Sequence, residues 1–122
     1  DQMAIVPDTA IDREQLNRAF MNIFANSVAA VKKRRNPKIG VATFFLKDFN
    51  IVRVEIFDNG HGIPKGLREK VLEPYFSTKD EGTGLGLALV QQIISEHEGY
   101  LRIISNKPYG ARIIIELPVK IS

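Results

Sequence analysis

Two pairs of strand-like runs, each joined by a short polar turn, restrict this chain of 122 residues to few folds. The runs Ile39 to Leu46 and Ile51 to Asp58 flank a Lys-Asp-Phe-Asn turn, and the runs Tyr100 to Ser105 and Ala111 to Leu117 flank residues 106–110. Short runs rich in β-branched residues on both sides of turn residues are typical of hairpins. We therefore expect two antiparallel hairpins.

A helical pattern precedes each predicted hairpin. Asp12 is a suitable N-cap for a long helix that reaches about Lys33. A second helix should run from a glycine-rich stretch to about Glu98, with Gly99 at the C′ position that ends it.

Two shorter elements complete the predicted order. Ile5–Val6 reads as a short strand. A helical pattern also follows Gly66, with Leu67, Val71 and Leu72 on its apolar side. Antiparallel hairpins with helices packed on one face form an α+β sandwich. A chain of this length is most simply one domain, residues 1–122.

Composition and charge exclude several functions. The chain has no cysteine, which rules out disulfides and thiolate metal sites. Its net charge is +3, and the basic run at residues 32–35 either suits the negative end of the first helix or binds an anion. No aromatic residues interleave with this run, so nucleic acid is not an expected partner. No apolar run reaches the ~20 residues of a membrane span. The absence of cysteine fits a cytoplasmic location, which we expect.

The first candidate site is Asp58-Asn59-Gly60-His61-Gly62. The period of two in the preceding strand places Asp58 on the same face as Val54 and Ile56. A buried carboxylate is costly without a donor, and the amino group of a purine would be a suitable one. The alternative is a plain Asn-Gly hairpin turn, which predicts a partner strand after Gly62.

The second candidate is the pair Asn22 and Asn26, four residues apart in the first helix. This spacing puts both amides on one helix face, beside alanines. Amide groups can bind Mg²⁺ or phosphate oxygens. The alternative is a solvent-exposed face that happens to contain asparagine.

The third candidate is the run Gly82-Thr83-Gly84-Leu85-Gly86-Leu87, directly before the second helix. Glycine backbone at a helix N-terminus presents free N–H groups to an anion. The spacing matches neither a P-loop nor a dinucleotide fingerprint. By itself, the run is also compatible with a simple turn.

Taken in order, the motifs Asn-x-x-x-Asn, Asp-x-Gly-x-Gly, Glu73 to Lys79 and Gly82 to Leu87 resemble the ATP-binding domain of sensor histidine kinases, in the Bergerat-fold superfamily. The short lid is similar to that of the nitrogen-regulation type. The resemblance implies a mixed, roughly five-stranded sheet with about three helices on one face. It also implies that ATP and Mg²⁺ bind under a mobile lid at about residues 63–82.

The resemblance implies a role for each matching residue. Asp58 would accept the adenine amino group, and Gly60 and Gly62 would let the backbone pass close to the base. Asn26 would bind Mg²⁺, with Asn22 as its companion near the metal and phosphates. The lid and the phosphate side would comprise Phe76, Thr78, Lys79, Gly82, Thr83, Gly84, Leu85, Gly86 and Leu87.

Two positions depart from the family pattern. Ser27 replaces a common alanine, and Ala29 stands where many relatives have a basic residue. The cation that neutralises phosphate must then come from elsewhere. Lys79 is the first choice, with Arg68 and Lys33 as alternatives.

The remaining expectations concern the reaction. ATPases of the superfamily carry a glutamate base where this chain has Asn22, so hydrolysis is disfavoured and transfer to a histidine is favoured. Neither His61 nor His97 lies in a phosphoacceptor setting, so the acceptor is expected on a separate dimerisation domain. The parent is then a homodimer that signals to a response regulator, and this fragment alone is a monomer. The alternatives are a non-catalytic nucleotide-binding regulatory module, a Bergerat-fold ATPase and an anti-sigma serine kinase.

Overall fold

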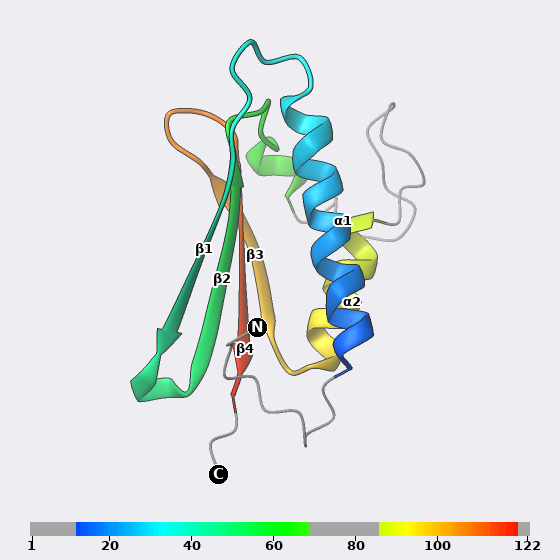
Figure 1. The fold of residues 1–122 in the computed structure, drawn as a ribbon, viewed down its shortest axis with the longest axis vertical. Helices are drawn as coiled ribbons and strands as arrows, with labels where there is room; N and C mark the ends of the chain where they lie inside the picture. The colour runs from blue at the N-terminus through cyan, green and yellow to red at the C-terminus, as the bar shows by residue number, and fades with distance from the viewer. Residues whose placement is uncertain (1–11, 69–85, 120–122) are drawn as a thin grey trace.

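The computed structural model of the chain describes residues 12–68 and 86–119. The elements in this part of the chain are α1 (Arg13–Val31), β1 (Ile39–Leu46), the 3-10 turn η1 (Lys47–Phe49), β2 (Ile51–Asp58), the 3-10 turn η2 (Lys65–Leu67), α2 (Gly86–Glu96), β3 (Tyr100–Ser105) and β4 (Ala111–Pro118). Figure 1 shows the strands as one layer and both helices as another.

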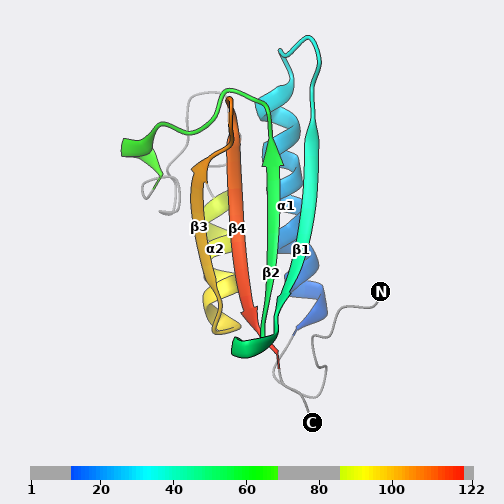
Figure 2. The same ribbon diagram turned by 90° about the vertical axis from the view of Figure 1, so that its left-hand side faces the viewer.

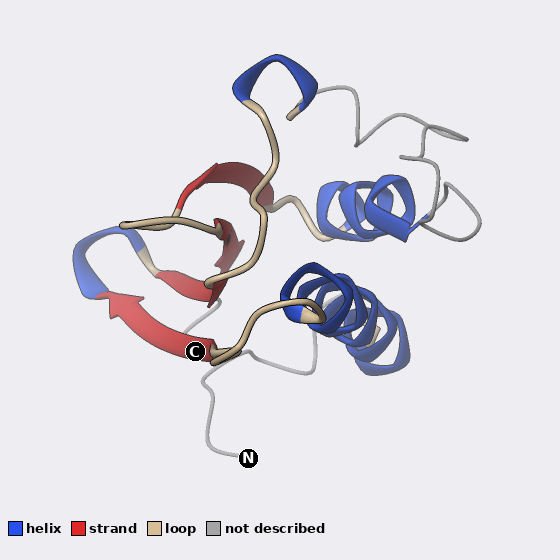
Figure 3. Cartoon of the chain, turned by 90° about the horizontal axis from the view of Figure 1, so that it is seen from above, coloured by secondary structure: helices blue, strands red, loops and turns tan. Residues whose placement is uncertain are grey.

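The four described strands form one sheet in the order β1-β2-β4-β3, and every neighbouring pair is antiparallel. Both predicted hairpins are present, and α1 and α2 lie on the same side of the sheet (Figures 2 and 3). The predicted α+β sandwich is confirmed. The predicted strand at Ile5–Val6 lies outside the described residues, as do Val71 and Leu72, so the fifth strand and the helix after Gly66 stay predictions.

The core fills the space between the sheet and the two helices. Along β2, Val52, Val54 and Ile56 are buried on the helix side, as the period of two predicts. They pair across the sheet with apolar residues of β4, for example Ile56 with Ile113. Each fully buried side chain of this kind contributes about 1.5–3 kcal/mol. The helices supply Leu16, Ala19, Ile23, Val90, Ile93 and Ile94 to the same core.

The helix ends agree with the predicted caps at one point and correct them at another. Asp12 Oδ1 accepts a hydrogen bond from Gln15 N at 3.1 Å, so Asp12 is the N-cap of α1. At the end of α2, however, the left-handed C′ residue is Glu98 (φ 61°) and not Gly99. Gly99 is required for a different reason, since a Cβ atom there would lie 2.6 Å from Glu116 O on β4.

His97 ties the two helices together at this end of the molecule. Its Nε2 accepts a hydrogen bond from Asp12 N at 2.9 Å, and its Nδ1 lies 2.8 Å from Ile93 O. The neutral ring therefore carries its proton on Nδ1 and donates it to Ile93 O. Among the described residues, no helix is long and apolar enough to cross a membrane.

Candidate functional site

The side chain of Asp58 is buried at the end of β2, on the side of the sheet that the helices cover. The residue is only 4% exposed. Its Oδ1 accepts a hydrogen bond from Gly60 N at 2.8 Å and a longer one from Ala111 N at 3.4 Å. No group in residues 12–68 or 86–119 bonds to Oδ2. Within these residues the carboxylate is thus held by one oxygen, and none of them competes with a ligand for the other.

The turn after Asp58 is not a plain hairpin turn. No strand follows β2 within residues 59–68, because β2 already pairs with β1 on one side and β4 on the other. Gly60 lies against the end of α1, where a Cβ atom would overlap with Ala30 O, and His61 N donates to this same oxygen at 3.3 Å. The Asn-Gly hairpin alternative is therefore wrong.

The turn between β3 and β4 closes the other side of Asp58. Asn106 Nδ2 donates to Asp58 O at 2.9 Å. Gly110 has φ 114°, and a Cβ atom there would overlap with Asp58 O, so only glycine fits. Gly62 also has a positive φ of 74°, and a Cβ atom on it would lie 3.1 Å from Gly110 O. Contacts within the protein thus require Gly60, Gly62 and Gly110.

The paired asparagines lie on α1, and Asn26 faces the start of α2. Both residues are half-buried. A Cβ atom on Gly86, the first residue of α2, would lie 3.6 Å from Asn26 Nδ2. The structure thus brings the asparagine motif next to the last glycine of the glycine-rich motif. Of the two departures from the family pattern, Ser27 is buried and Ala29 is exposed.

Several predicted site residues lie outside the described part of the chain. These are Phe76, Thr78, Lys79, Gly82, Thr83, Gly84 and Leu85. Gly86 and Leu87, which were expected directly before the second helix, instead form the first residues of α2, and Leu87 packs against the core.

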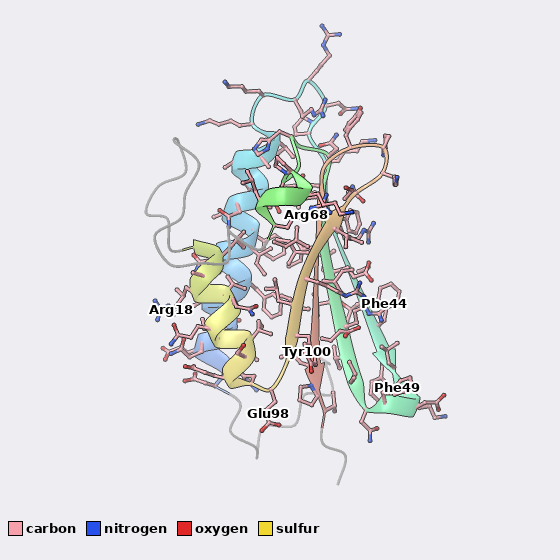
Figure 4. The ribbon with its side chains drawn as sticks, turned by 180° about the vertical axis from the view of Figure 1, so that it is seen from behind. Arg18, Phe44, Phe49, Arg68, Glu98 and Tyr100 are labelled. Carbon is pink, nitrogen blue, oxygen red and sulfur yellow. The ribbon has the colours of Figure 1, made fainter. Side chains whose placement is uncertain are left out.

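The candidate phosphate cations differ in what holds them. Arg68 Nε donates to Ile63 O at 3.0 Å, and its Nη2 donates to Ser105 Oγ at 2.8 Å. Arg68 therefore anchors η2 to the end of β3, where Figure 4 shows it. Lys33 is exposed beyond the end of α1, and Lys79 lies outside the described residues.

Sequence reasoning missed four residues that support Asp58. It treated residues 106–110 as a simple turn and Arg34 as part of a basic run. Arg34 Nη2 donates to Gly60 O at 3.3 Å, whereas Asn106, Gly110 and Ala111 contact Asp58 directly. Knowledge of the β2–β4 register would have revealed Asn106, Gly110 and Ala111, because this pairing brings the start of β4 beside the end of β2. Nothing local in the sequence indicates this pairing.

Comparisons with known proteins agree with this geometry. The family model described as "Histidine kinase-, DNA gyrase B-, and HSP90-like ATPase" matches residues 11–121. The signal transduction histidine-protein kinase AtoS of Escherichia coli is 43% identical over 108 residues, 88% of this chain and 17% of that protein. The sensory histidine kinase/phosphatase NtrB of Rhodobacter capsulatus is 36% identical over 125 residues, 93% of this chain and 34% of that protein.

Solved structures give the same result. The mycobacterial sensor histidine kinase MprB aligns with a TM-score of 0.78 at 33% identity, covering 88% of this chain and 72% of that one. The catalytic domain of the histidine kinase ThkA aligns with a TM-score of 0.76 at 34% identity, covering 88% and 68%. The chain spans only 17% to 34% of the two curated relatives above. The chain belongs to the histidine kinase-, DNA gyrase B- and HSP90-like ATPase family, and within it to the ATP-binding domains of sensor histidine kinases.

Proposed function

We propose that this chain is a single ATP-binding domain, residues 1–122, that binds ATP with Mg²⁺ and presents the γ-phosphoryl group to a histidine on a separate dimerisation domain. One observation carries the proposal. Asp58 is buried, its Oδ1 is held by backbone donors, and no described group uses its Oδ2. This arrangement suits the amino group of adenine, which needs a fixed acceptor.

Asn26 and the start of α2 would serve the phosphate end of the nucleotide. The N-terminus of a helix favours an anion through its free N–H groups and its dipole. Gly86 begins α2 beside Asn26, which supports a phosphate position between them. The residues outside the described part complete this side in the proposal: Phe76, Thr78, Lys79, Gly82, Thr83, Gly84 and Leu85 in and beside a lid at about residues 63–82.

The donor set fits a magnesium ion that arrives with its nucleotide. Within the described residues, no group of three or more His, Cys, Asp or Glu could hold a metal. Mg²⁺ commonly takes one or two oxygen ligands from the protein and the rest from substrate phosphates and water. The amide oxygen of Asn26 would be such a ligand, with Asn22 beside it, and the ion would neutralise phosphate charge.

Transfer is favoured over hydrolysis because the amide of Asn22 cannot act as a general base. Neither described histidine lies in a phosphoacceptor setting, since His97 follows the end of α2 and His61 lies in the turn after Asp58. Both ring nitrogens of His97 are engaged with backbone groups, and His61 Nδ1 lies 2.7 Å from Gly62 O. The acceptor would lie on the dimerisation domain of a homodimeric parent, which passes phosphate to a response regulator. The domain itself would work in the cytoplasm, where ATP is supplied.

The test is to mix the domain with ATP, Mg²⁺ and the matching histidine-bearing helical domain, and to measure acid-labile phosphate on that partner. The kinase proposal expects labelling that depends on Mg²⁺ and on the acceptor histidine. ATP binding measured by calorimetry without any labelling would instead support a non-catalytic nucleotide-binding module. Absence of ATP binding would overturn both.

A further inference from the structure

Arg34 touches both loops that surround Asp58. It lies in the connection between α1 and β1, four residues after Ala30. Its Nη2 donates to Gly60 O at 3.3 Å, and its guanidinium carbon lies 4.0 Å from the centre of the Tyr109 ring. One side chain therefore bridges the turn after β2 and the turn between β3 and β4.

These two contacts hold the two chain segments whose backbone N–H groups donate to Asp58 Oδ1. Gly60 N donates to Asp58 Oδ1, and Gly60 O accepts from Arg34 Nη2. Ala111, the second donor, follows Tyr109 by two residues. Fixing the Gly60 backbone and the Tyr109 ring therefore fixes the distance between the two N–H groups that orient the carboxylate.

The backbone gives Arg34 a defined starting point for this contact. Arg34 N donates to Val31 O at 2.9 Å, which continues the chain beyond α1 as a tight turn. Arg34 is half-buried, whereas its neighbours Lys33 and Arg35 are exposed. The run of four basic residues thus contains one that is packed into the site end and three that are not.

We propose that Arg34 is a positioning residue that, together with Tyr109, holds the two backbone donors of Asp58 so that Oδ2 meets the amino group of adenine. This inference rests on the proposed function. The simpler role, a cation at the negative end of the α1 dipole, would make Arg34 and Arg35 equivalent. The two roles therefore differ in what they predict for base selectivity.

The experiment measures the binding of ATP and inosine triphosphate to the 122-residue chain by calorimetry. Inosine triphosphate carries an oxygen where ATP has the amino group and a proton on the adjacent N1, so the ratio of the two affinities reports the hydrogen bonding at the edge of the base that faces Asp58. We expect Arg34→Gln to weaken ATP by about fivefold to tenfold with little change in inosine triphosphate, since a cation–π contact and one hydrogen bond are lost. Arg35→Gln is the matched control and should change neither affinity more than about twofold.

Tyr109 supplies the second variant. Tyr109→Leu should lower the ATP preference as Arg34→Gln does, and Tyr109→Phe, which keeps the ring, should restore most of it. The double variant Arg34→Gln/Tyr109→Leu should be no worse than Arg34→Gln alone, because Arg34→Gln already removes the contact with the Tyr109 ring.

The outcomes separate this inference from the function on which it rests. If the unmodified chain binds no ATP, the proposed function fails. If it prefers ATP and both Arg34→Gln and Tyr109→Leu keep this preference, ATP binding stands and the positioning role is wrong. If either variant weakens both nucleotides equally, the contact supports the fold generally, and the positioning role is again wrong.

Discussion

The two ends of the sheet are built differently. At the site end, defined as residues 32–38, 59–68 and 106–110, the chain is held by partners far apart in sequence. Asn59, for example, bonds to Lys38 N and Asn36 O, both at 2.8 Å. At the opposite end, residues 12–14, 47–50 and 95–99, most bonds are local, such as Asn50 N to Lys47 O at 3.4 Å. Figure 4 shows Arg68 near the first end and Phe49 and Glu98 near the second.

Backbone strain follows the same division. Both described glycines with positive φ, Gly62 and Gly110, lie at the site end. Both described residues with positive φ that carry a side chain, Asn50 and Glu98, lie at the opposite end. The site end needs glycine because backbones approach each other there. At the opposite end, Asn50 and Glu98 adopt positive φ with a side chain present, at a modest cost, and Gly99 is the position there that a backbone contact restricts to glycine.

Charge separates the two ends as well. The site end has eight Lys or Arg residues and no Asp or Glu in its three segments: Lys32, Lys33, Arg34, Arg35, Lys38, Lys65, Arg68 and Lys107. The opposite end has five acidic residues against two cations: Asp12, Glu14, Asp48, Glu96 and Glu98 against Arg13 and Lys47. Such a field draws an anion such as a nucleoside triphosphate toward the site end.

The largest effect is expected from Gly110→Ala. The new Cβ atom would overlap with Asp58 O, and φ is 114°, so we expect a loss of roughly 2–4 kcal/mol in unfolding free energy. Gly66→Ala is the matched control, because nothing lies within 4 Å of its Cβ position, and it should change stability by less than about 0.5 kcal/mol. Urea denaturation measures both. Equal stabilities would mean that the close approach of Gly110 to Asp58 places no constraint on the site end.

Substitution of Asp58 comes next and affects binding more than folding. Asp58→Ala should cost roughly 1.5–3 kcal/mol in ATP affinity, about tenfold to a hundredfold. Asp58→Asn is sharper, since its amide oxygen can still accept from Gly60 N and Ala111 N while its NH₂ group faces the purine donor. Calorimetry should find ATP binding lost to a similar extent with the fold retained. Unchanged affinity in both variants would remove Asp58 from the site.

Asn26→Ala tests the metal side of the proposed nucleotide site. In the unmodified chain, added Mg²⁺ should strengthen nucleotide binding. In the variant, the affinities with and without Mg²⁺ should agree within about twofold, because a metal ligand has been removed. Asn17, exposed on the same helix, supplies the control Asn17→Ala. A variant at Asn26 that keeps the full magnesium dependence would refute the ligand assignment.

The opposite end could be predicted from sequence better than the site end, for a physical reason. The N-cap Asp12, the hairpin turn after β1 and the alternation along β2 all depend on residues near one another in the chain. The support of Asp58 depends on β4 lying beside β2, and no turn joins these two strands. Asn106 and Arg34 therefore could not be assigned, although Asp58 itself could, because burial at the end of a strand is a local pattern. The role predicted for Gly99 was wrong for the same reason, because glycine is required there by the backbone of Glu116 on another strand.

The smallest effect should come from Asp12→Ala at the opposite end. Loss of the cap bond to Gln15 N should cost about 1 kcal/mol in unfolding free energy. Asp12→Asn keeps a capping oxygen and should retain most of that stability. Under conditions where both variants are fully folded, calorimetry should find that each binds ATP with the same affinity as the unmodified chain. The reason is that no contact of Asp12 reaches the described site residues. If Asp12→Ala lowered the ATP affinity as well as the stability, the two ends would be energetically coupled through α1. The separation between a locally built end and a binding end would then not hold.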